Sequence, residues 1–122
     1  LATGLFGLVA ADDPRFTSTI DAVETWLRSG NTVRRYTHED GLPGDEGGFN
    51  LMTSWLIDAK ILVGETAEAR FLFDRYLELA GPTGLLAEEV DLHTGRGLGN
   101  HPQAYSHLGL IQNACNLAAL EG

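Results

Sequence analysis

Apolar residues recur every three or four positions in four long segments of this 122-residue sequence. That spacing places them on one side of an α-helix and therefore predicts four helices. The segments are residues 12–29, 49–63, 66–80 and 104–122. A shorter apolar stretch over residues 1–10 is expected to be part of a fifth, buried helix. Thr32-Val33 is too short to predict a strand, so we expect an all-α, single helical domain over residues 1–122.

The predicted helices each have one apolar side. The positions expected to face the interior are Phe16, Ile20, Val23 and Leu27, then Met52, Trp55, Leu56, Ala59 and Leu62, then Ala69, Phe73, Tyr76, Leu77 and Ala80, and finally Ala104, Leu108, Ile111, Cys115 and Ala118. Because Cys115 is the only cysteine, no disulfide can form within the chain. We expect it to be a small buried hydrophobe in a reducing, cytoplasmic compartment.

The connections between the predicted helices alternate in length. Asp13 followed by Pro14 marks a helix start, since an acidic cap and proline suit the first turn. Only two or three residues around Gly64 join the second and third long helices, which predicts an antiparallel hairpin. Two long polar loops, residues 31–48 and 84–100, are expected to gather at one end of the helices, where a site can form.

Acidic residues outnumber basic ones by 17 to 8, which gives a net charge of −9 with histidine neutral. Such a surface repels phosphate groups, so neither nucleic acids nor anionic membranes are expected partners. A neutral polyol is indifferent to this charge. The apolar residues 1–10 have no basic segment before them and are too few for a bilayer-spanning helix, which needs about 20 residues.

Among the side chains that could carry out catalysis, the carboxylates are the remaining candidates once the others are excluded. The four histidines lack the spacing of a zinc site and no cysteine pair accompanies them, so we expect no metal and no other cofactor. The turn typical of a nucleophilic serine is also missing. Glu88 and Glu89 remain, but glycoside hydrolysis needs two separated carboxyl groups with different roles. Two neighbours that point in different directions cannot be that pair, and a Glu-Glu dipeptide alone is usually solvated surface.

Four stretches of the chain stand out as motifs: DGLPGDEGGF at residues 40–49, TSWLIDA at 53–59, LLAEEVD at 85–91 and GNHPQAYSHL at 99–108. Together they resemble glycoside hydrolase family 15, the glucoamylase and trehalase-like enzymes. The resemblance extends over essentially the whole chain and covers the C-terminal part of the family's catalytic domain. It implies that the chain supplies about five helices of an (α/α)6 barrel, whose active site lies where the long loops collect.

The resemblance also implies a catalytic base. Glu88 takes that position in the family's motif and would deprotonate the water that attacks the anomeric carbon with inversion, although Val90 stands where an aromatic residue is usual. The general acid belongs to a region outside this chain. Tyr105 and His107 would lie just beyond the base, with Tyr105 as a further substrate-binding residue.

Other residues resemble the family's sugar-contacting positions. Arg35 and Tyr36 are similar to a pair that contacts the sugar nearest the cleavage point, where a guanidinium offers paired donors to neighbouring hydroxyls. Glu46 resembles a second sugar-facing position, and Asp40 is placed to orient Arg35. The substrate implied is an α-linked glucose oligosaccharide or disaccharide.

Two consequences and two alternatives follow. With one of two catalytic carboxylates, the isolated chain is expected to be inactive and to self-associate through exposed inner-helix surface. The alternatives are a stand-alone α-helical protein-interaction module and a non-catalytic relative of the family. An enzyme needs Arg35, Glu46 and Glu88 to face one cleft, whereas an interaction module has no reason to bring them together.

Overall fold

The computed structural model describes residues 1–39, 41 and 44–122. Within them lie five α-helices: α1 (Ala2–Leu5), α2 (Pro14–Trp26), α3 (Asn50–Leu62), α4 (Thr66–Glu78) and α5 (Ala104–Glu121). A 3-10 turn, η1 (Gly81–Thr83), follows α4. The four long helices predicted from periodicity are thus confirmed, each within a few residues of its expected bounds.

The start of α2 confirms the predicted acidic cap. The Asp13 carboxylate accepts a hydrogen bond from the Arg15 N–H at 2.8 Å, and Pro14 occupies the first turn. The Arg15 guanidinium also donates to this carboxylate at 2.7 Å. These hydrogen bonds lower the pKa of Asp13 to about 2, so the cap is ionised at neutral pH.

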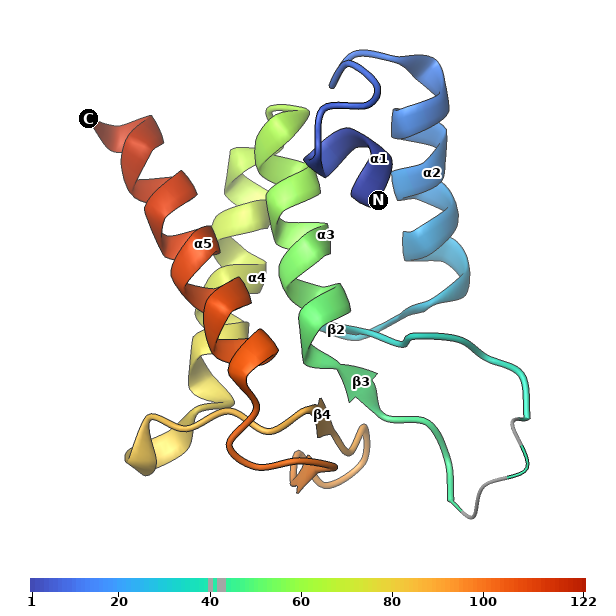
Figure 1. Ribbon diagram of the computed structural model, residues 1–122, viewed down its shortest axis with the longest axis vertical. Helices are drawn as coiled ribbons and strands as arrows, with labels where there is room; N and C mark the ends of the chain where they lie inside the picture. The colour runs from blue at the N-terminus through green and yellow to red at the C-terminus, as the bar shows by residue number, and fades with distance from the viewer. Residues whose placement is uncertain (40, 42–43) are drawn as a thin grey trace.

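Helix α3 is the central element of the molecule, with α1, α4 and α5 packed around it (Figure 1). Leu56, Ile57 and Ala59 are buried, as are their partners from other helices, among them Phe16, Ile20, Leu72, Tyr76 and Leu117. The turn at residues 63–65 brings α4 back along α3 as the expected hairpin. Leu62 and Leu77, which were predicted to face inwards, are exposed because they lie in the last turns of their helices.

Strands of two residues each are present, and the expectation of no strand was wrong. β1 (Arg28–Ser29) pairs with β2 (Thr32–Val33), while β3 (Gly48–Phe49), β4 (Glu89–Val90) and β5 (Gly97–Leu98) form an antiparallel sheet in the order β3-β4-β5. Elements this short contain no periodic pattern, and only their partners define them. The sheet joins the two long loops and confirms that they lie at one end of the helices (Figure 1).

Helix α5 packs with the side opposite to the one predicted. Ser106, Asn113 and Leu117 are buried against the other helices. The residues predicted to be inside are all exposed: Ala104, Leu108, Ile111, Cys115 and Ala118. The pattern failed because the α3–α5 contact is made by small and polar groups, for example the Asn113 amide, which donates to the Ser54 carbonyl at 3.0 Å.

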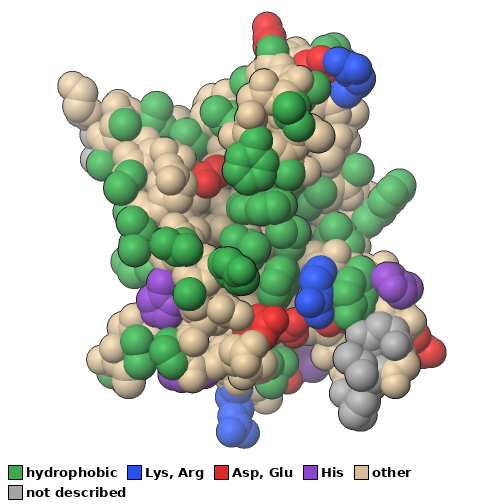
Figure 2. Space-filling view, viewed as in Figure 1, with side chains coloured by type: hydrophobic (Ala, Val, Ile, Leu, Met, Phe, Trp, Pro, Cys, Tyr) green, Lys and Arg blue, Asp and Glu red, His purple; other side chains and the backbone are tan. Residues whose placement is uncertain are grey.

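The outward side of α5 is therefore apolar. Hydrophobic side chains lie along α5 and in a band between α5 and α1 on the face seen in Figure 2. Leu108 and Ile111 are 61% and 59% exposed. None of the helices in the described part of the chain combines the length and apolar character that crossing a membrane requires.

A buried lysine ties α2 to the α3–α4 turn. Lys60 is 4% exposed, and its ammonium donates to Glu24 at 2.6 Å and to Glu65 at 2.7 Å. Burial alone would lower the pKa of Lys60, but these two carboxylates raise it. Arg28 extends the group of charges by pairing with both Glu24 and Glu68. Lys60 therefore stays charged although it is buried.

We predict that Gly109→Ala destabilises the chain. Alanine is about 1 kcal/mol better than glycine inside an exposed helix, but a Cβ at Gly109 would meet Ser54 Oγ and Cβ, the latter at 2.7 Å. We expect overpacking to cost about 1–3 kcal/mol in the free energy of unfolding, measured by urea denaturation. The double variant Ser54→Gly/Gly109→Ala should recover much of this loss. A stabilising Gly109→Ala would contradict the close α3–α5 contact.

Candidate functional site

The loop that carries Glu88 is fixed first at Leu86. Its N–H donates to Nε2 of His107 at 3.2 Å, and its carbonyl accepts from the Gln103 N–H at 2.9 Å. The other ring nitrogen of His107, Nδ1, lies 2.7 Å from the Gln103 carbonyl. Because a carbonyl only accepts and a backbone N–H only donates, these contacts fit the tautomer with its proton on Nδ1. Two hydrogen bonds thus join the loop to the start of α5, and the third orients the His107 ring.

The next residue, Ala87, is held from two helices at once. Its carbonyl accepts from the Asn50 side-chain amide at 2.8 Å and from the Ser106 hydroxyl at 2.7 Å. Asn50 and Ser106 are both about 1% exposed, at the first turns of α3 and α5. The Asn50 N–H also donates to the Glu88 carbonyl at 3.1 Å. The backbone that leads to Glu88 is therefore part of the packed core.

Glu88 and Glu89 have different partners, as expected for neighbours at a strand. Oε2 of Glu88 accepts from the Asn100 N–H at 3.1 Å and from its side-chain amide at 2.9 Å. Oε1 of Glu89 lies 3.5 Å from the Arg35 guanidinium. The two carboxylates are therefore held by different groups, Glu88 by Asn100 and Glu89 by Arg35.

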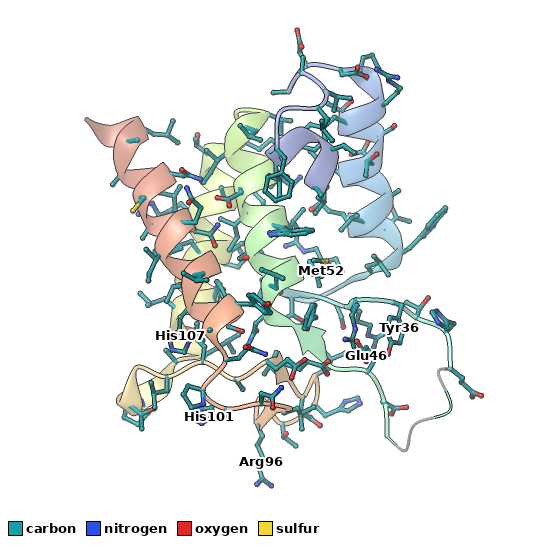
Figure 3. All side chains as sticks on the ribbon, viewed as in Figure 1. Tyr36, Glu46, Met52, Arg96, His101 and His107 are labelled. Atoms are coloured by element: carbon teal, nitrogen blue, oxygen red, sulfur yellow. The ribbon has the colours of Figure 1, made fainter. Side chains whose placement is uncertain are left out.

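Arg35 is the centre of a compact polar cluster. Its Nε lies 3.1 Å from Oε1 of Glu46, and its guanidinium also faces Glu89. The guanidinium lies over the rings of Tyr36 and Phe49, 4.9 Å and 5.0 Å from their centroids, which adds cation–π attraction. In Figure 3, Tyr36 and Glu46 lie side by side on the loop that precedes β3. The cluster thus places hydrogen-bond donors of the guanidinium and acceptors of the carboxylates next to aromatic rings.

The electrostatics of the cluster favour a proton on Glu89. Its side chain is only 14% exposed, and burial is the main cause that raises its pKa. The negative charge of Glu46 raises the pKa of Glu89 further, while the Gly47 N–H and Arg35 lower it. The Arg35 guanidinium thus only partly offsets the repulsion of Glu89 by Glu46 and Glu88.

An open pocket of about 1000 Å³ lies beside this cluster. It is lined by residues 34–39, 41, 44–47, 89, 91–93 and 98, and its walls include Arg35, Tyr36 and Glu46. Neither Glu88 nor Tyr105 belongs to that lining, and Tyr105 is 61% exposed at the start of α5. Asp40 lies outside the described residues.

Of Arg35, Glu46 and Glu88, only the first two are in direct contact. Glu88 lies on the other long loop, directly before Glu89, which contacts Arg35. Sequence reasoning missed the contact of Glu89 with Arg35 and that of Asn100 with Glu88. Both join residues distant in sequence, so no local pattern reveals them. Among the residues that the structure describes, no three His, Cys, Asp or Glu side chains form a group that could hold a metal.

We predict that Arg35→Met makes stability more sensitive to pH. Without the guanidinium, the pKa of Glu89 rises further above its ordinary value of 4.5. A raised pKa means that the folded state holds the proton more tightly, so stability falls as pH rises through that range. Because Arg35 is partly exposed, we expect a modest additional loss at pH 7 relative to pH 4, about 0.5–1 kcal/mol by urea denaturation.

Arg96→Met is the matched control for this experiment, because Arg96 is exposed on the β4–β5 turn and points away from the cluster in Figure 3. An Arg35→Met variant that loses the same stability at both pH values would contradict the proposed balance of charges.

Comparison with known proteins places these residues in a family. The model of glycosyl hydrolases family 15 matches residues 3–115. A trehalase of Mycolicibacterium smegmatis is 42% identical over an alignment of 114 positions that covers 91% of this chain and 17% of that protein. A trehalase of Thermoplasma acidophilum is 43% identical, over 93% of this chain and 20% of that protein. The chain thus spans about a fifth of the length of these relatives.

Solved structures agree with this placement. A wild-type glycosidase superimposes with a TM-score of 0.80 at 27% identity, over 93% of this chain and 33% of that one. A variant glycosidase in complex with glucose gives the same TM-score at 26% identity. The helices described above thus correspond to a third of those enzymes and to part of the (α/α)6 barrel. This chain belongs to family 15 of the glycosyl hydrolases.

Proposed function

We propose that this chain is the C-terminal part of the catalytic domain of an inverting α-glucoside hydrolase, and that trehalose is its substrate. The observation that carries the proposal is the match of nearly the whole chain to family 15, with trehalases among the relatives at 41–43% identity. A glucose complex of a similar glycosidase supports a glucose-containing ligand. Maltooligosaccharides, the substrates of a glucoamylase, are the second class to test.

In the proposed mechanism Glu88 is the catalytic base. Its carboxylate removes a proton from a water molecule, whose oxygen attacks the anomeric carbon from the face opposite the leaving group. The glycosidic C–O bond breaks while a carboxylic acid outside this chain protonates the departing oxygen. The packed backbone at residues 86–88 supports this role, since a base must be held at a fixed distance from the reacting carbon.

The polar cluster is proposed to bind the glucose unit. Arg35 offers paired N–H donors to neighbouring hydroxyls, and Glu46 offers acceptor oxygens within contact of Arg35. Tyr36 adds an aromatic ring and a hydroxyl to the same pocket wall. Asp40 and Tyr105 are proposed as further contacts, Asp40 through Arg35 and Tyr105 from the start of α5.

We predict that Glu88→Gln in the longer protein that contains this chain abolishes trehalose hydrolysis. Glutamine keeps the shape but cannot take the proton, so kcat should fall by about 100-fold or more. The wild type should first release α- and β-glucose in equal amounts, because inversion changes the configuration of only one of the two units; NMR spectroscopy measures this ratio. Glu78→Gln, at an exposed site on α4, is the control.

The other outcomes of this experiment separate the alternatives. Full activity of Glu88→Gln would move the base elsewhere in the protein. Absence of activity on both trehalose and maltose in the wild type would favour a protein-interaction module or a non-catalytic relative.

The isolated chain is proposed to be inactive and to self-associate, because the apolar side of α5 lies open. We expect light scattering to show dimers or larger species, and Leu108→Glu/Ile111→Glu to shift them towards monomer. Trp26→Glu, at an exposed apolar residue on α2, should have a smaller effect. A monomeric wild-type chain at high concentration would contradict this proposal.

A further inference from the structure

The Glu88 carboxylate lies against the two residues that follow β5, Gly99 and Asn100, which we call its seat. Asn100 binds one oxygen, Oε2, with both its backbone N–H, at 3.1 Å, and its side-chain amide, at 2.9 Å. The Asn100 carbonyl in turn accepts from the Glu88 N–H at 2.8 Å. The two residues are thus joined by three hydrogen bonds, although twelve positions separate them in the sequence.

Gly99 gives the carboxylate room to lie against this backbone. A Cβ on Gly99 would be 2.8 Å from Oε2 and 3.0 Å from Cβ of Glu88, closer than van der Waals contact allows. Gly99 also has a φ of +70°, which side chains rarely adopt. Any other residue there would push the Glu88 side chain out of the seat or distort the turn.

In this seat the two carboxylate oxygens of Glu88 differ in their hydrogen bonding. Oε2 is occupied by two donors, and within residues 1–39, 41 and 44–122 the structure gives Oε1 no hydrogen-bond partner. Two donors on one oxygen fix the orientation of the carboxylate plane. A carboxylate held in this way presents one defined free oxygen.

We infer that Asn100 is the positioning residue of the catalytic base: it holds Oε2 of Glu88 so that Oε1 receives the proton of the attacking water. This inference rests on the proposed role of Glu88. It assigns Asn100 no contact with substrate, so its effect on the reaction passes entirely through Glu88.

The test uses the longer protein, with glucose binding measured by calorimetry to count intact sites. Asn100→Ala removes the side-chain donor, and the isosteric Asn100→Asp replaces it with an acceptor that repels Oε2. Both should lower kcat per glucose-binding site by about tenfold or more, with the aspartate at least as low as the alanine, while KM changes by less than about twofold. A role in packing alone would spare the isosteric variant.

Two controls make the result specific. Thr94→Ala removes a hydroxyl that donates a hydrogen bond to Asp91 within the turn between β4 and β5. It does not alter the hydrogen bonds of Glu88 and should leave kcat unchanged. In the Glu88→Gln background, adding Asn100→Ala should change the residual rate by less than about twofold, since the two residues act as a unit.

The failures can be told apart. Wild-type kcat in Asn100→Asp, with Glu88→Gln inactive, would overturn the positioning role alone. So would an equal fractional loss from Asn100→Ala in both backgrounds, because Asn100 would then act independently of Glu88. Wild-type activity of Glu88→Gln would overturn the base itself and the inference with it.

Discussion

The hydrogen bonds at the carbonyl of Ala87 hold together the end of the molecule that carries the two long loops. One buried amide from α3 and one buried hydroxyl from α5 meet on this single oxygen. A buried carbonyl without partners would cost free energy, and a pair of donors from different helices fixes where those helices begin relative to each other. Because Glu88 follows directly, its position is set by the core rather than by a flexible loop.

Small and polar groups also make the contact between α3 and α5. Gly109 lets α5 approach Ser54 closely, and the amide of Asn116 donates to Asp58 at 2.9 Å. Burial raises the pKa of Asp58, so this carboxylate depends on its amide partners. Polar packing turns the apolar side of α5 away from α3. The open surface of α5 is therefore a consequence of its polar contact with α3.

Much of the fold was predictable because its signals are local. Periodicity gave the long helices, Asp13 with Pro14 gave the start of α2, and the alternation of loop lengths placed both polar loops at one end. The side of α5 that packs could not be predicted, because Ser106 and Asn113 do not register as interior residues on an apolar pattern. The two-residue strands carry no periodicity at all.

The candidate site was predictable only through resemblance, and only for single residues. Motif matching pointed to Arg35, Glu46 and Glu88, but no motif tells that Glu89 faces Arg35 or that Asn100 holds Glu88. Those contacts arise when β3, β4 and β5 pair across long stretches of sequence. The residues of the candidate site are therefore recognisable from local motifs, whereas their contacts depend on pairing between segments that are distant in the sequence.

The most direct measurement is a crystal structure of the longer protein, with Glu88→Gln, bound to glucose. We predict that glucose hydroxyls contact Arg35 and Glu46, and that residue 88 faces the anomeric carbon across one water molecule, about 3 Å from each. Glucose bound away from Arg35, or a residue 88 turned from the anomeric carbon, would contradict the proposal that the two polar loops form part of a glycosidase active site.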